Sequence, residues 1–232
     1  MISIRKGVDR GHANHGWLDT NHTFSFANYY HPDHMGFRSL RVINEDKVNP
    51  GAGFPPHSHQ DMEIITYVLE GAVAHKDSTG GGGVIRPGEV QYMRAGEGVT
   101  HSEYNASDSE LLHLYQIWLL PKKKGLKAGY AQKSFGDERN GVFRLVASPD
   151  GREGSLLINQ DSSLYASVLE EGAEIDLPYV PGRYGWLQVA RGGVEIGGAI
   201  MQAGDGAKIE SEESVSVKVL APDTDLLFFD LV

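Results

Sequence analysis

Residues 51–63 read GAGFPPHSHQDME and residues 98–105 read GVTHSEYN, and these two stretches carry most of the structural information in the chain. Each places two metal-binding side chains at positions i and i+2: His57 and His59 in the first, His101 and Glu103 in the second. Side chains at i and i+2 of a β-strand point to the same face of the sheet. Two such strands facing each other would bring three imidazoles and one carboxylate to a common point. This ligand set suits a divalent transition metal and leaves coordination positions for water or substrate.

The composition excludes several classes of protein. The chain has no cysteine, which excludes disulfides, zinc–thiolate sites, iron–sulfur clusters and cysteine nucleophiles. Its net charge of -10 argues against broad, non-specific binding of nucleic acid. Residues 1–6 contain no apolar run long enough for a signal peptide, and no stretch of the chain approaches the roughly 18 consecutive apolar residues that a membrane span needs. We therefore expect a cytoplasmic protein that binds neither a membrane nor, directly, a nucleic acid.

The pattern of apolar residues and glycines predicts an all-β fold. The 29 glycines recur between β-branched and aromatic runs, and convincing helical periodicity is scarce. Residues 63–69 and 112–118 are typical strand sequences, and residues 186–190 followed by 192–197 repeat the strand–glycine–strand pattern around Gly71. This similarity indicates two related β domains.

The domain limits follow from a connector and from the distribution of histidines. Residues 121–127, PKKKGLK, are typical of a solvated linker, so we place an N-terminal domain at 1–125 and a C-terminal domain at 126–232. All ten histidines lie between His12 and His113. A histidine metal site would therefore lie in the N-terminal domain, and the C-terminal domain would lack one.

Residues 51–71 and 98–105 resemble the two sequence motifs of the cupin superfamily, a family of jelly-roll β-barrels. Five positions match the first motif: Gly51, His57, His59, Glu63 and Gly71. Three positions match the second: Gly98, His101 and Asn105. Two details depart from the pattern, because the spacing from Glu63 to Gly71 is one residue long and Gly96 replaces an upstream proline.

Further stretches narrow the resemblance to the pirin family: residues 23–30 (TFSFANYY), 36–44 (GFRSLRVIN) and 61–71 (DMEIITYVLEG). The resemblance implies a bicupin, two jelly-roll barrels of which only the N-terminal one holds a metal. It implies four ligands: His57, His59, His101 and Glu103. It also implies the quercetin 2,3-dioxygenase activity associated with bacterial pirins, whereas mammalian pirin is a nuclear cofactor of transcription regulators.

Other residues near the motifs have less specific interpretations. Glu63 is a fifth ligand, a partner of a ligand or a strand-edge carboxylate, and we favour a supporting or structural role. His75 and His113 fall in strands, where we expect core or surface positions. The remaining histidines are expected mostly on the surface or in hydrogen bonds: His12, His15, His22, His31 and His34. Four residues are candidates for an apolar pocket and equally for ordinary core: Phe26, Phe54, Tyr92 and Met93.

Two functions from different classes share this site. The first is a metal-dependent dioxygenase that opens the ring of a flavonol such as quercetin, with dioxygen as co-substrate and Glu103 as ligand and general base. Iron(II) is the metal we expect, although nickel, manganese, copper and zinc accept the same ligands. The second is a metal-dependent regulatory protein that binds a protein partner without turnover.

Overall fold

The computed structural model describes all 232 residues, Met1–Val232. Its contacts divide the chain into two compact units. The N-terminal unit consists of Gly11–Gly136 with Ile158–Gln160, and the C-terminal unit consists of Met1–Arg10, Asp137–Leu157 and Asp161–Val232. Both units are built from strands, and the only helices are short 3₁₀ turns at Gly7–Asp9, Pro32–His34, Gly136–Arg139 and Arg152–Gly154. The all-β, two-domain cupin prediction is confirmed.

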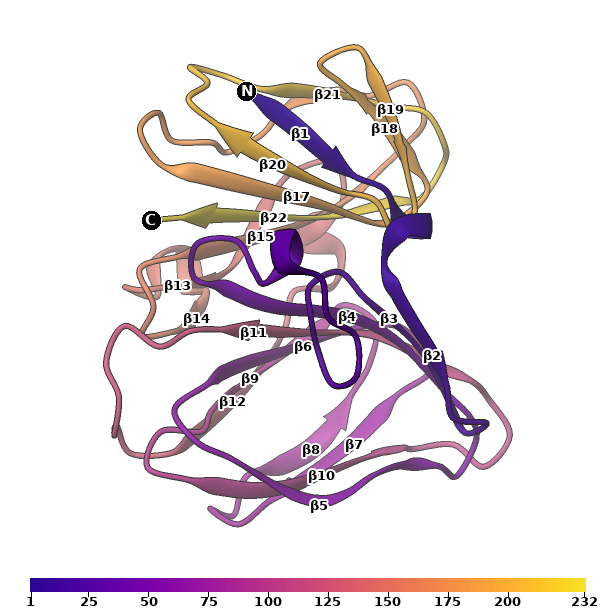
Figure 1. Ribbon diagram of the computed structural model, residues 1–232, viewed down its shortest axis with the longest axis vertical. Coiled ribbons are helices and arrows are strands. Elements are labelled where there is room, and N and C mark those ends of the chain that lie inside the picture. The colour runs from indigo at the N-terminus through magenta and orange to yellow at the C-terminus, as the bar shows by residue number, and fades with distance from the viewer. The chain divides into compact units, whose positions relative to one another are not determined.

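The N-terminal unit has two antiparallel sheets, which Figure 1 shows as facing layers. The larger sheet has the order β12-β9-β6-β11-β4-β3-β2 and the smaller one β5-β10-β7-β8. The strands are β2 Gly11–Asn14, β3 Leu18–His22, β4 Leu40–Val48, β5 Gly53–His59, β6 Glu63–Glu70, β7 Val73–Asp77, β8 Gly82–Ile85, β9 Glu89–Arg94, β10 Val99–Asn105, β11 Leu112–Leu119 and β12 Gly129–Ser134.

The C-terminal unit repeats this plan. Its larger sheet has the order β1-β20-β17-β22-β15-β13-β14, and its smaller sheet has the order β16-β21-β18-β19. The strands are β1 Ile2–Arg5, β13 Arg144–Ser148, β14 Leu156–Leu157, β15 Ser163–Leu169, β16 Glu174–Asp176, β17 Tyr184–Arg191, β18 Gly193–Ile196, β19 Ala199–Gln202, β20 Gly206–Glu210, β21 Ser216–Val219 and β22 Thr224–Leu231. Apolar side chains such as Leu187, Val194 and Phe228 form its core.

Strand β5 lies at the edge of the smaller sheet of the N-terminal unit, a position that suits the two prolines in its sequence. Pro55 and Pro56 lack backbone N–H groups, and proline is therefore tolerated in edge strands and at bulges rather than in central strands. The register between β5 and β10 shifts at this point, so that Ser102 alone lies opposite the two prolines. Across the shift, His57 pairs with His101 and Phe54 pairs with Glu103.

The limits of the two units differ from the predicted domain limits of 1–125 and 126–232. Strand β1 pairs with β20, which places residues 1–10 in the C-terminal unit. Residues 121–127 connect β11 to β12, and β12 pairs with β9 inside the N-terminal unit. That residues 1–125 and 126–232 fold as independent domains stays a prediction. No helix in the protein has the length and apolar character needed to cross a membrane.

Candidate metal centre

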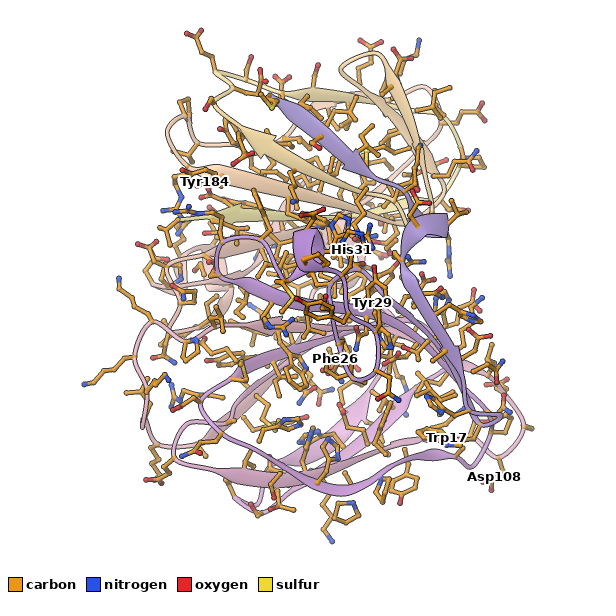
Figure 2. The ribbon with its side chains drawn as sticks, in the orientation of Figure 1. Trp17, Phe26, Tyr29, His31, Asp108 and Tyr184 are labelled. Carbon is orange, nitrogen blue, oxygen red and sulfur yellow. The ribbon has the colours of Figure 1, made fainter.

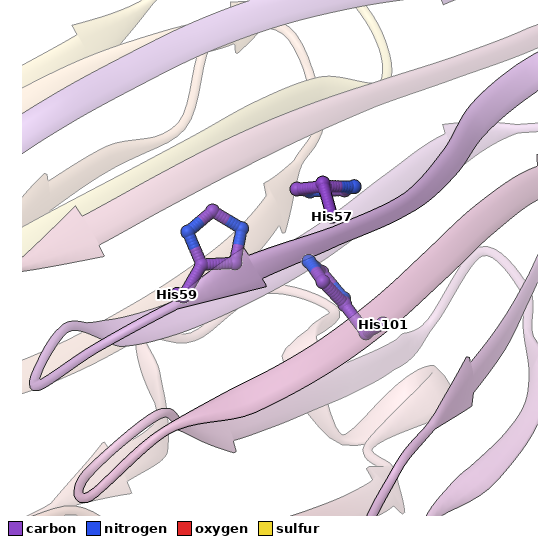
Figure 3. Close-up of side chains that lie close together, drawn as sticks. All are labelled: His57, His59 and His101. Carbon is purple, nitrogen blue, oxygen red and sulfur yellow. The ribbon is translucent and has the colours of Figure 1, made fainter.

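Strands β5 and β10 bring the two sequence motifs together. Along β10 the side chains alternate between buried and more exposed, and His101, Glu103 and Asn105 all fall on the buried side. His57 lies directly across from His101 in the register, and His59 follows on the same face of β5. Figure 3 shows the three imidazoles, two from β5 and one from β10, converging on one another.

The three imidazoles have the geometry of a metal site. One ring nitrogen of each residue lies within 4.8 Å of one from each of the others. The ring centroids are 4.4 Å apart for His57 and His101, and 4.9 Å apart for His59 and His101. The Nε2 atom of His101 is buried and has no hydrogen-bond partner. A buried nitrogen without a partner is costly unless something binds it, so these residues fit a metal ion.

Hydrogen bonds and burial keep these rings in the form that binds metals. The Nδ1–H group of His57 donates to the carbonyl oxygen of Pro55 at 2.8 Å, which leaves Nε2 with a free lone pair. Burial and the neighbouring His57 ring lower the pKa of His59 to about 4. Burial also lowers the pKa of His101 to about 4, against the opposing effect of Glu103. Both imidazoles are therefore neutral at pH 7, as metal ligation requires.

Glu103 lies at the same site but in a second, overlapping group. Its carboxylate, His75 and His101 offer ligand atoms that all lie within 4.8 Å of one another. The Gln116 amide donates to Glu103 Oε2 at 3.0 Å, and the Thr66 hydroxyl donates to Oε1 at 3.4 Å. Burial alone would raise the pKa of this carboxyl, but the neighbouring His101 ring and the hydrogen bond from the Gln116 amide hold it below its usual value. Glu103 is therefore ionised at neutral pH.

His75 is a site residue that sequence reasoning missed. We expected a core or surface histidine, and His75 is indeed buried, but its Nδ1 atom lies 3.4 Å from His101 Nδ1. Its Nε2 atom lies 3.3 Å from the Asp77 carboxylate. His75 and Asp77 stand at i and i+2 on β7, opposite Glu103 and His101 on β10. The i, i+2 spacing is the one signal for this pair in the sequence, and only the pairing of β7 with β10 places the pair at the site.

A cavity of about 410 Å³ opens beside the histidines in the N-terminal unit. Its walls are aromatic: Trp17, Phe26, Phe54 and Trp118 line it, and Figure 2 marks Trp17 and Phe26. Trp17 meets Phe54 edge-to-face at 5.2 Å, and Phe26 meets Trp118 in the same way at 5.4 Å. The Trp118 Nε1 and Gln116 Oε1 atoms are buried without a hydrogen-bond partner. An aromatic molecule with hydroxyl or carbonyl groups would complement these walls.

The remaining predicted residues divide between the cavity and other positions. His15 and His22 line the cavity, and the His22 ring bonds to the Asn44 side chain at 2.9 Å. Tyr92 and Met93 are buried without lining the cavity. The remaining histidines have other neighbours: His12 bonds to Asp19, His113 bonds to Glu45, and His31 packs against His34.

Glu63, whose role the sequence left open, is fully buried. Its Oε2 atom accepts hydrogen bonds from the Tyr92 hydroxyl and from the backbone N–H of Asn159, both at 2.8 Å. Asn159 belongs to the short segment of residues 158–160 that completes the N-terminal unit. These contacts give Glu63 a structural role.

Comparison with known proteins identifies the family. Residues 4–119 match the family model described as Pirin, and residues 145–231 match the model described as the quercetinase C-terminal cupin domain. The chain belongs to the pirin family. The resemblance found in the sequence is confirmed.

Relatives match this pirin-family protein over almost its whole length. The quercetin 2,3-dioxygenase of Escherichia coli (strain K12) is 49% identical over 231 residues, covering 100% of this chain and 99% of the relative. A pirin-like protein of Caulobacter vibrioides is 41% identical, covering 97% of this chain and 98% of the relative. The solved structure of the bacterial pirin YhhW from Escherichia coli in complex with nickel(II) matches with a TM-score of 0.93 and 48% sequence identity. The match covers 100% of this chain and 99% of the YhhW chain.

A second buried carboxyl group, Asp46, lines the cavity of this pirin. It stands on β4 between Thr20 on β3 and Leu114 on β11. Burial raises its pKa to about 7; the Thr20 hydroxyl opposes the rise, and the charges of Glu103 and Glu45 add to it. Of the two buried carboxyl groups that line the cavity, Asp46 is therefore the one that titrates near neutral pH.

The Asp46 carboxyl should make stability depend on pH. Its pKa rises from 3.8 in the unfolded chain to about 7 in the folded protein, so folding favours the protonated carboxyl group. The contribution of this group to the free energy of unfolding is therefore fully present below pH 4 and is lost as the pH rises through about 7. Three pKa units correspond to about 4 kcal/mol in the free energy of unfolding. In metal-free protein, the stability of Asp46→Asn relative to wild type should therefore increase as the pH rises from 5 to 8. Thermal melting at each pH measures this difference. The exposed control Asp108→Asn should show no such trend, and an Asp46→Asn curve parallel to wild type would contradict the assignment.

Proposed function

We propose that this protein is a metal-dependent dioxygenase that opens the ring of a flavonol such as quercetin. One observation carries the proposal: a cluster of three histidines, with the buried and unpartnered His101 Nε2 atom, lies in the wall of a cavity lined by aromatic side chains. The activity named for the Escherichia coli relative at 49% identity supports the same function.

We propose His57, His59, His101 and Glu103 as the metal ligands. The three histidines already converge, and Glu103 belongs to the overlapping group that shares His101. Nitrogen and oxygen ligands of this kind accept iron(II) and nickel(II), and nickel(II) is present in the complex of the YhhW relative. Iron(II) remains our choice of native metal. A divalent metal bound here would act as a Lewis acid that holds flavonol and dioxygen in adjacent positions.

The chain itself supplies orientation of the substrate. The cavity volume falls within the range for small-molecule sites, and the aromatic walls fit the flat rings of a flavonol. The unpartnered Trp118 Nε1–H can donate to a substrate oxygen, and Gln116 Oε1 can accept from a substrate hydroxyl. Holding the substrate in one orientation beside the histidines lowers the entropic cost of reaction.

Glu103 is the general base in this proposal. Its carboxylate is ionised at neutral pH and is oriented by the amide of Gln116 and the hydroxyl of Thr66. It lines the cavity, so it can take the proton of the flavonol hydroxyl that becomes an enolate.

The test is oxygen uptake and carbon monoxide release with quercetin after anaerobic loading of the protein with iron(II) or nickel(II). Both should occur together, at one carbon monoxide for each dioxygen consumed. A flavone that lacks the 3-hydroxyl group, and metal-free protein, serve as controls that should show neither. Tight binding of metal and flavonol without oxygen uptake would contradict the proposal and would favour the regulatory hypothesis. The cytoplasmic location stays a prediction.

A further inference from the structure

A chain of three buried side chains runs from β7 to the histidine cluster. The Asp77 carboxylate lies 3.3 Å from His75 Nε2, and His75 Nδ1 lies 3.4 Å from His101 Nδ1. The side chains of His75 and Asp77 are almost completely buried. His75 also stacks on Tyr130 with ring centroids 5.0 Å apart, which fixes the plane of its imidazole. Asp77 and His75 are not part of the ligand set proposed above, whereas His101 is.

The proton positions in this chain follow from Asp77. Burial would raise the pKa of its carboxyl, but hydrogen bonds from Thr79, His75 and Gly81 hold it below its usual value, so Asp77 only accepts hydrogen bonds. His75 therefore donates from Nε2 to Asp77, and in a ring with a single proton this leaves Nδ1 as an acceptor. The Gln91 amide, at 3.5 Å from that Nδ1, also donates to it. Glu103 Oε1 lies 3.9 Å from the same atom, beyond hydrogen-bond distance.

We infer that Asp77 and His75 form a relay that selects the tautomer of His101 and so presents its Nε2 lone pair to the metal. With His75 Nδ1 as acceptor, His101 carries its proton on Nδ1 and donates it to His75. The Nε2 atom of His101 is then unprotonated, and it is the nitrogen that has no partner within the protein. His75 and Asp77 are positioning residues. The inference rests on the proposed function in so far as it concerns metal binding.

The contacts of Asp77 make a sharp test available. Its Oδ1 atom accepts from Thr79 N at 2.8 Å, Thr79 Oγ1 at 2.7 Å and Gly81 N at 3.0 Å, whereas Oδ2 faces His75. In Asp77→Asn the amide oxygen must take the position of Oδ1, because the three groups around that position all donate hydrogen bonds. The amide NH₂ group must then face His75. The whole chain then reverses: His75 is protonated on Nδ1, and His101 is protonated on Nε2. Metal binding at His101 would force two N–H groups to face each other.

The experiment compares wild type with Asp77→Asn, and with Asp19→Asn as the matched control. Asp19 bonds to His12 at 3.0 Å on the exposed part of the same unit, so the same substitution alters a histidine partner away from the site. Nickel(II) affinity of metal-free protein, measured by competition with a chelator, should fall about 10–100-fold in Asp77→Asn, the loss typical of residues that orient a ligand. It should remain unchanged in Asp19→Asn.

Long-range ¹H–¹⁵N NMR of the metal-free proteins reads the tautomers directly and is insensitive to a purely structural role. His101 should be protonated on Nδ1 in wild type and on Nε2 in Asp77→Asn. A His101 protonated on Nε2 or a doubly protonated His75 in wild type, or unchanged nickel affinity in Asp77→Asn, would overturn the inference. Failure of wild type to bind nickel would count against the proposed function instead, and the tautomers would still decide the relay.

Discussion

Replacing Glu103 with glutamine is expected to abolish most flavonol ring opening while leaving most of the bound metal. Glutamine retains an oxygen that can coordinate a metal, but it cannot accept a proton as a base. The rate of dioxygen uptake should therefore fall by about 10²–10⁴, the usual contribution of a general base. The site can accommodate the amide, because its oxygen can keep the hydrogen bond from Gln116 while its NH₂ group donates to the Thr66 hydroxyl, which can also accept.

The measurement is turnover per bound metal, from oxygen uptake and elemental analysis on the same sample. Glu45→Gln is the control, since Glu45 bonds to His113 at 2.9 Å outside the cavity. Near-normal turnover by metal-loaded Glu103→Gln would remove the base role and leave Glu103 as a ligand at most.

Replacing His101 with alanine should remove the metal itself. His101 is the residue shared by both groups of potential ligands, and its Nε2 atom is the buried atom left without a partner. The affinity for nickel(II) or iron(II) should fall by more than the roughly 10–100-fold expected for a residue that only supports a ligand. Titration of metal-free protein with each ion checks this.

His113→Ala is the control for that experiment, because His113 is also paired and partly buried in the N-terminal unit. His59→Ala, at a more exposed position of β5, tests the same centre with a smaller risk to folding. One metal per chain at wild-type affinity in both ligand variants would refute the assignment.

Local sequence patterns were sufficient for several of the strands and for the convergence of the histidines. Residues 63–69 and 112–118 lie in β6 and β11, as their apolar runs predicted. The spacing of His57, His59 and His101 works because strand geometry is local and repeats every two residues. The absence of histidines after His113 likewise indicated which half of the chain to consider.

The rest of the site depends on contacts that no local pattern reveals. His75 and Asp77 have the same i, i+2 spacing, but only the pairing of β7 with β10 brings them to His101. Nothing in the sequence distinguishes Asp46 from the other acidic residues, because its raised pKa comes from burial between neighbouring strands. Trp17 precedes β3 in an irregular segment, so no periodicity predicted that it would form a cavity wall.

The pairing of β1 with β20 has a consequence for how the chain acquires its structure during synthesis. Met1 bonds to the backbone of Glu210, 209 positions later, so strand β1 belongs to a sheet whose other strands are all made after residue 136. Residues 11–136 can begin to fold while the ribosome is still translating, whereas residues 1–10 must wait, unpaired, for nearly the whole chain. At about 5–20 residues per second that delay lasts roughly ten seconds or more. A tag or fusion placed ahead of Ile2 would therefore act on the C-terminal unit, although in sequence it is far from the other strands of that unit.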